Sequence, residues 1–104
     1  MDYSQLSDLE INQRVSNIIP GRFIFYSDYV WDSEWEKTFD PCNKAADAWP
    51  LIQANGICIG YDGISWDASC HLHDIGQVND WKGHPEKPLR MAMIVFLMIQ
   101  ESKL

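Results

Sequence analysis

The chain has 104 residues and a formal net charge of −7, with 46% hydrophobic and 22% charged residues. This length and composition are typical of a folded globular protein, so we expect a single domain over residues 1–104. The negative charge argues against extended binding to DNA or RNA, because affinity for a phosphate backbone comes mainly from Lys and Arg.

The start of the chain indicates a cytoplasmic protein. Met1 is followed by polar residues rather than by a basic start and an apolar stretch, so we expect no secretory signal peptide. The longest apolar run covers nine residues, 91–99, whereas crossing a bilayer takes about 20, so we expect no membrane span. In this compartment reduced thiols are the default, and we expect no structural disulfide among Cys42, Cys58 and Cys70.

The first element is predicted to be a helix over Asp8–Ile18. Ser7 stands at the N-cap position and Glu10 follows three residues later, which is the pattern of a capping box. A Pro-Gly pair ends this helix, and the aromatic and branched residues of Arg22–Tyr29 predict a strand. Asp32–Lys37 is expected to form a charged loop or a strand end.

A second helix is predicted within residues 39–56. Pro50 would interrupt a helix that began at Asn43, but with Asp47 as N-cap it falls in the first turn, where its missing N–H costs little. We therefore expect the regular helix to begin near Ala48. Asn55-Gly56 is a typical helix C-terminal cap.

The strongest strand signal is a hairpin over residues 57–68. Its two arms, 57–61 and 64–68, flank Asp62-Gly63, a dipeptide favoured in two-residue turns. Residues 70–85 are polar and aperiodic, and predict a long loop or an irregular third strand of the sheet. This order of elements predicts an α+β fold, a small antiparallel sheet packed by about three helices with a buried C-terminal helix.

The C-terminal helix is predicted to begin at Pro88 and to end near Ser102. Apolar residues occupy both of its sides, and two arrangements would cover them. One side packs on the sheet and the other on a second copy, which makes a homodimer or a higher oligomer. Alternatively, the helix is completely buried within one copy.

A cluster of metal-binding residue types lies at Cys70, His71 and His73, followed by Asp74. On an extended strand the two imidazoles would point to the same side, but no sequence pattern supplies a third and a fourth ligand. The alternatives are ordinary loop histidines, or a general acid or base beside Asp74. We assign no catalytic residue, metal or cofactor, and interpret Cys58 as an inert core thiol.

Basic residues gather around the start of the predicted C-terminal helix, at Lys82, Lys87 and Arg90. Cations oppose the helix dipole at this end, whereas an anion is favoured there by the dipole and by free backbone N–H groups. A bound phosphate or carboxylate would reconcile this pattern, and Trp81 and His84 could stack on a ring. The alternative is mobile side chains in water.

Acidic residues concentrate between Asp28 and Asp40, in a stretch that also contains two of the five tryptophans. The alternatives are a solvated face and a docking face for a basic partner protein. The contact residues of such a face would be Trp31, Asp32, Glu34 and Trp35. Tryptophan is enriched at interfaces, although in a small domain most tryptophans fill the core.

Three stretches of the sequence together resemble the phage NinX-like family, small proteins of lambda-like phages and enterobacterial prophages. They are DYSQLSDLEINQRV, FDPCNKAADAWPLI and PLRMAMIVFLMIQE. The resemblance runs from the first predicted helix to the last and is least in residues 70–87. It implies a phage source and an infected bacterial host, and it carries over no activity or catalytic residues.

The favoured hypothesis is a non-enzymatic phage accessory protein that acts by binding. In this hypothesis Trp81, Lys82, His84, Lys87 and Arg90 hold a small anionic, nucleotide-like ligand, as in counter-defence by sequestration. One alternative is an acidic inhibitor or adaptor of a host protein, using the acidic, Trp-bearing stretch. Another is a small metal-dependent or Cys/His enzyme.

Overall fold

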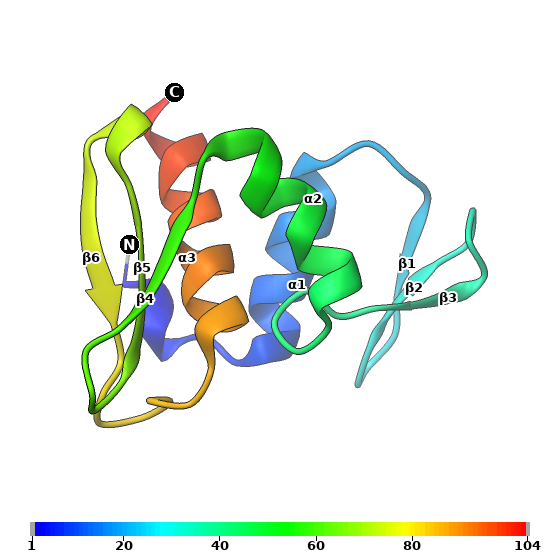
Figure 1. Ribbon diagram of the computed structural model, residues 1–104. Coiled ribbons are helices and arrows are strands. Elements are labelled where there is room, and N and C mark those ends of the chain that lie inside the picture. Colours follow the sequence, from blue (N-terminus) through cyan, green and yellow to red (C-terminus); the bar gives the residue numbers. More distant parts are fainter. Residues whose placement is uncertain (1, 104) are drawn as a thin grey trace.

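The computed structural model describes residues 2–103 (Figure 1). Within this part the fold is α+β, with three α-helices and two small antiparallel sheets where the sequence predicted one sheet. The C-terminal helix α3 (Pro88–Ser102) lies between the sheet within residues 58–79 on one side and the helices α1 (Asp8–Ile18) and α2 (Ala45–Asn55) on the other. The other sheet, within residues 23–39, lies beyond α1 and α2 at the far end.

Helix α1 (Asp8–Ile18) confirms the predicted boundaries and cap. The Ser7 side chain accepts a hydrogen bond from the Glu10 N–H, and the Glu10 carboxylate accepts one from the Ser7 N–H, each at 3.1 Å. These two bonds satisfy backbone donors that a helix start leaves unpaired. Ile11 and Val15 on the inner face are fully buried.

The first sheet, called sheet A, joins β1 (Phe23–Phe25), β2 (Val30–Asp32) and β3 (Lys37–Phe39) in that order. The strand predicted over Arg22–Tyr29 is shorter, because the Tyr26 N–H donates to the Tyr29 carbonyl and the chain turns there. Asp32 ends β2 and Lys37 begins β3, so residues 33–36 form the turn between them, in line with the expected charged loop.

Helix α2 (Ala45–Asn55) begins three residues earlier than predicted, and Pro50 lies inside it. The prediction of Asp47 as N-cap was wrong because this carboxylate has other partners. It accepts hydrogen bonds from Lys37 Nζ at 2.5 Å and from the Asp40 N–H at 2.9 Å. Gly56 ends the helix with φ of 66°, the left-handed conformation expected of a glycine cap.

The second sheet, called sheet B, joins β4 (Cys58–Tyr61), β5 (Trp66–Cys70) and β6 (Ile75–Asn79). The predicted hairpin is present, but its connection has four residues rather than two. Asp62 Oδ1 accepts the N–H groups of Ile64 and Ser65, at 2.8 and 2.9 Å, which draws both residues into the turn. The irregular stretch after Cys70 supplies the third strand.

Helix α3 resolves the two arrangements that its apolar sides left open. Nearly every residue from Arg90 to Ile99 is buried within one copy of the chain. Sheet B covers one side of the helix, and α1 and α2 cover the other. The described helix is therefore buried within one copy, which is the second of the two arrangements.

Candidate functional site

The basic residues at the start of α3 meet an anion that belongs to the chain itself. Asp8, in the first turn of α1, accepts a hydrogen bond from Arg90 Nη1 at 2.7 Å and another from Lys87 Nζ. Burial raises the pKa of Asp8, but hydrogen bonds from Lys87, Arg90 and Asn43 lower it further, so the pKa lies below its ordinary value. The anion expected at this helix start is the Asp8 carboxylate.

Arg90 was predicted to bind a ligand, and its surroundings contradict this role. The side chain is fully buried. Its Nη2 donates to the backbone carbonyls of Leu6 and Ser4, at 2.6 and 3.1 Å. A guanidinium has five donors in a rigid fork, so it can bind several acceptors at once. Arg90 therefore ties the N-terminal segment to α3, and as a buried side chain it presents no donor at the surface.

Three other predicted ligand residues lie in the turn before α3. Trp81 is 58% exposed, and Lys82 Nζ lies 5.1 Å from the centre of its ring. His84 Nδ1 lies 2.9 Å from a carboxylate oxygen of Asp80, and this hydrogen bond lowers the pKa of Asp80. This turn therefore presents one exposed ring and one exposed cation, while Lys87 and Arg90 are engaged with Asp8.

The Cys/His cluster is not arranged as the extended strand that the metal hypothesis needed. Residues His71–His73 form a turn of 3₁₀-helix, η2, between β5 and β6. The buried Cys70 thiol lies 3.2 Å from the Asn55 carbonyl and is directed into the protein. Within residues 2–103, no group of three or more His, Cys, Asp or Glu side chains is placed to hold a metal ion.

The cysteines differ in exposure from what the sequence suggested. Cys58 was interpreted as a core thiol, and this was wrong: it begins the edge strand β4 and is exposed. Cys42 is buried, and burial strongly raises the pKa of its thiol.

The tryptophans lie on the surface rather than in the core. Trp35, Trp81, Trp49 and Trp66 are 76%, 58%, 56% and 36% exposed, and Trp31 is half-buried. The expectation that most of them fill the core was wrong, because α3 and the aliphatic face of α1 supply the core instead. Exposed tryptophans in this number are typical of binding surfaces.

The structure brings together three of the four predicted partner-binding residues. Asp32, Glu34 and Trp35 line one groove between sheet A and α2. Trp31 lies on the opposite face of β2, since neighbouring residues of a strand point to opposite sides.

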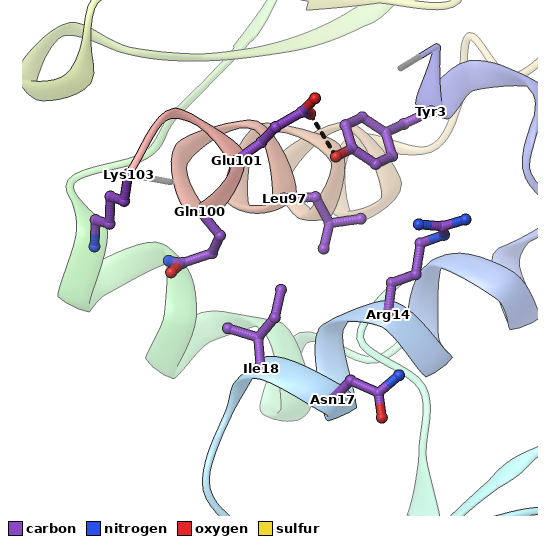
Figure 2. A pocket seen from close by; sticks show the side chains of 8 residues that line it. All are labelled: Tyr3, Arg14, Asn17, Ile18, Leu97, Gln100, Glu101 and Lys103. Carbon is purple, nitrogen blue, oxygen red and sulfur yellow. Dashed lines mark hydrogen bonds between the residues drawn. The ribbon is translucent and has the colours of Figure 1, made fainter.

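A different hollow, which the sequence did not indicate, lies between α1 and α3 (Figure 2). We call it the α1–α3 pocket, and its volume is about 500 Å³. Its apolar floor consists of Tyr3, Ile18 and Leu97, and Figure 2 shows Ile18 and Leu97 pointing toward one another across it.

The rim of the α1–α3 pocket is polar, with Arg14 at one end and Lys103 at the other. The amides of Asn17 and Gln100 lie on the rim as well. No carboxylate of residues 2–103 lies within 4 Å of either cation. An apolar hollow with a few convergent polar groups is the usual form of a small-molecule site.

Tyr3 and Glu101 close one side of this pocket. The Tyr3 hydroxyl donates to Glu101 Oε2 at 2.6 Å. Burial and this bond raise the pKa of Tyr3 to about 12, and the same bond lowers the pKa of Glu101. The carboxylate on the rim is therefore engaged with its own chain. Reasoning from the sequence missed this pocket because Tyr3 and Glu101, which close it, are 98 positions apart and belong to no local motif.

Comparison of the sequence with known protein families identifies the family of this chain. The profile described as "Bacteriophage P22, NinX" matches residues 2–100, which include all three α-helices nearly to the end of α3. The chain belongs to the bacteriophage P22 NinX family. This confirms the resemblance carried by the three sequence stretches. No curated protein and no solved structure matches this NinX family chain. None of its described helices is long and apolar enough to cross a membrane.

Proposed function

We propose that this NinX family protein is a non-enzymatic phage accessory protein that binds a small anionic molecule in the α1–α3 pocket. The observation that carries the proposal is the pair of cations on one apolar hollow. Arg14 and Lys103 come from the first and the last helix regions, line the same pocket, and have no described carboxylate within 4 Å. A bound anion would pair with both cations, while Glu101, the carboxylate on the same rim, stays engaged with Tyr3.

The shape of the pocket favours a ligand with an apolar or aromatic middle. Ile18 and Leu97 form the centre of the floor, between the two cationic ends. A heteroaromatic ring would pack on these side chains while Asn17 and Gln100 offer amide donors and acceptors to its edge. Phosphates would then reach Arg14 or Lys103. A nucleotide-like molecule combines these features.

The phage family gives this binding a context. Small accessory phage proteins commonly act by blocking host proteins or by capturing small signals, and this is an argument by class. We infer counter-defence by sequestration, in the cytoplasm of the infected bacterium, as the setting in which a captured nucleotide signal would matter. Release and chemical conversion of the ligand are not needed for this role.

Calorimetric titration of the purified protein tests the proposal. ADP is the anionic probe, and adenosine is its uncharged counterpart. We expect ADP to bind at least tenfold more tightly than adenosine. The double variant Arg14→Gln/Lys103→Gln should weaken ADP binding at least tenfold, because it removes two charge-assisted contacts.

The matched control is Arg22→Gln/Lys82→Gln, which removes one Arg and one Lys from exposed positions outside the pocket. This variant should bind ADP like the unmodified protein. Equal binding of adenosine and ADP, or an equal loss in both double variants, would overturn the proposal. A loss confined to the control variant would also overturn it, because neither Arg22 nor Lys82 lines the pocket.

A further inference from the structure

The groove between sheet A and α2 is the second large hollow of the molecule. We call it the sheet A–α2 groove, and its volume is about 510 Å³. Phe23 and Phe39 of the sheet and Pro50 and Leu51 of the helix give it apolar walls. The Phe23 and Phe39 rings pack against each other with centroids 4.9 Å apart, so one wall is a fixed aromatic surface.

Trp35 stands on the rim of this groove, in the turn between β2 and β3. It is 76% exposed, the most exposed of the tryptophans. Exposing so large a ring is unfavourable unless something covers it. Trp35 therefore adds an exposed ring to the apolar walls that Phe39 and Leu51 help to form.

The charge of the groove is acidic. Lys37 is the cation lining it, and its ammonium is paired with Asp47 Oδ1 at 2.5 Å. Asp32 uses Oδ1 to accept the backbone N–H groups of Glu34 and Trp35. The exposed Glu34 carboxylate has no described cation within 4 Å. A carboxylate beside an exposed indole ring suits a guanidinium or an ammonium group.

From this geometry we infer that the sheet A–α2 groove docks a basic peptide segment of a partner protein, in which a Lys or Arg neighbours an apolar side chain. The apolar residue would fill the space between Phe39 and Leu51. The cation would lie over the Trp35 ring and reach Glu34. The groove shares no lining residue with the α1–α3 pocket, and the ion pair of Lys37 with Asp47 shows how an ammonium group sits against one carboxylate of the groove.

Fluorescence anisotropy with defined peptides tests this inference. The probe is a short fluorescein-labelled peptide of alternating Arg and Leu, and the comparison peptide has Glu in place of Arg. We expect the Arg peptide to bind, with weaker binding at higher salt, and the Glu peptide to bind at least tenfold more weakly. Trp35→Ala and Glu34→Gln should each weaken binding of the Arg peptide about tenfold.

Two matched controls separate the groove from general attraction between a basic peptide and an acidic protein. Trp49→Ala removes another exposed indole, and Glu86→Gln removes another exposed carboxylate, both outside the groove. Both controls should bind the Arg peptide normally, and all four variants should bind ADP normally. Absence of binding, or equal losses in the groove variants and the controls, would overturn the inference without affecting the pocket proposal.

Discussion

Asp8 and Arg90 lie 82 positions apart in the chain, and Asp8 Oδ1 accepts a hydrogen bond from Arg90 Nη1 at 2.7 Å. Lys87 binds the other oxygen of the same carboxylate, and Asn43 Nδ2 donates to that oxygen at 3.1 Å. One side chain thus connects α1, the segment before α2, and the start of α3. This relationship replaces the external anion that the basic residues suggested.

Removing Asp8 should therefore destabilise the whole fold. In Asp8→Ala the fully buried Arg90 loses its carboxylate, and an uncompensated buried charge costs about 3 kcal/mol or more. Urea denaturation should show a free energy of unfolding lowered by about this amount. Asp28→Ala, which removes an exposed carboxylate, should change it by less than about 0.5 kcal/mol. Similar small changes in both variants would contradict the central role of Asp8.

The same carboxylate should contribute to acid sensitivity. The pKa of Asp8 is lower in the folded protein than its ordinary value of 3.8. Its contribution to stability is therefore complete above pH about 4, and is lost as the pH falls through the lower folded pKa. Asp8→Asn lacks this component, so its free energy of unfolding should fall less steeply below pH 4. Parallel pH profiles for both proteins, from urea denaturation, would disagree with this assignment.

Tyr3 should contribute at the alkaline end. Its pKa is raised from 10.0 to about 12 in the folded protein, so its contribution is present below pH 10 and is lost as the pH rises through 12. Tyr3→Phe should lose less stability over this interval than the unmodified protein, as measured by denaturation at successive pH values. Equal losses of stability in both proteins over this interval would contradict the assignment to Tyr3.

The three thiols should react at two different rates. Cys58 is exposed, whereas Cys42 and Cys70 are buried and burial raises the pKa of the Cys42 thiol. A colorimetric thiol reagent should modify one cysteine per chain rapidly in the native protein and the remaining two after denaturation. Cys58→Ser should remove the rapid phase, and a rapid phase that persists in this variant would place a second thiol at the surface.

The sequence predicted local features better than long-range partners. The α1 capping box, the Gly56 cap and the Pro88 helix start depend on residues within one turn, and all three are confirmed. The start of α2 was misplaced because Asp47 binds Lys37 and Asp40 rather than its own helix. Sequence patterns report local preferences, whereas a side chain with several acceptors or donors takes the partners that the tertiary fold brings to it.

The candidate sites show the same difference between residues that are close in sequence and residues that only the fold brings together. Asp32, Glu34 and Trp35 were predicted together because they are neighbours in sequence, and they share one groove. Arg90 was assigned to a surface site because the charge pattern near α3 does not reveal Asp8. Arg14 and Lys103 were not singled out, since nothing in the sequence indicates that the two ends of the chain meet.

Native mass spectrometry of the protein purified from phage-infected bacteria tests whether the α1–α3 pocket captures an anion, because the method detects small molecules that remain bound. We expect the unmodified protein to retain an anionic adduct, and Arg14→Gln/Lys103→Gln, purified in the same way, to lose it. An unmodified protein without any adduct, or an adduct retained equally by the double variant, would contradict capture of an anion in the α1–α3 pocket.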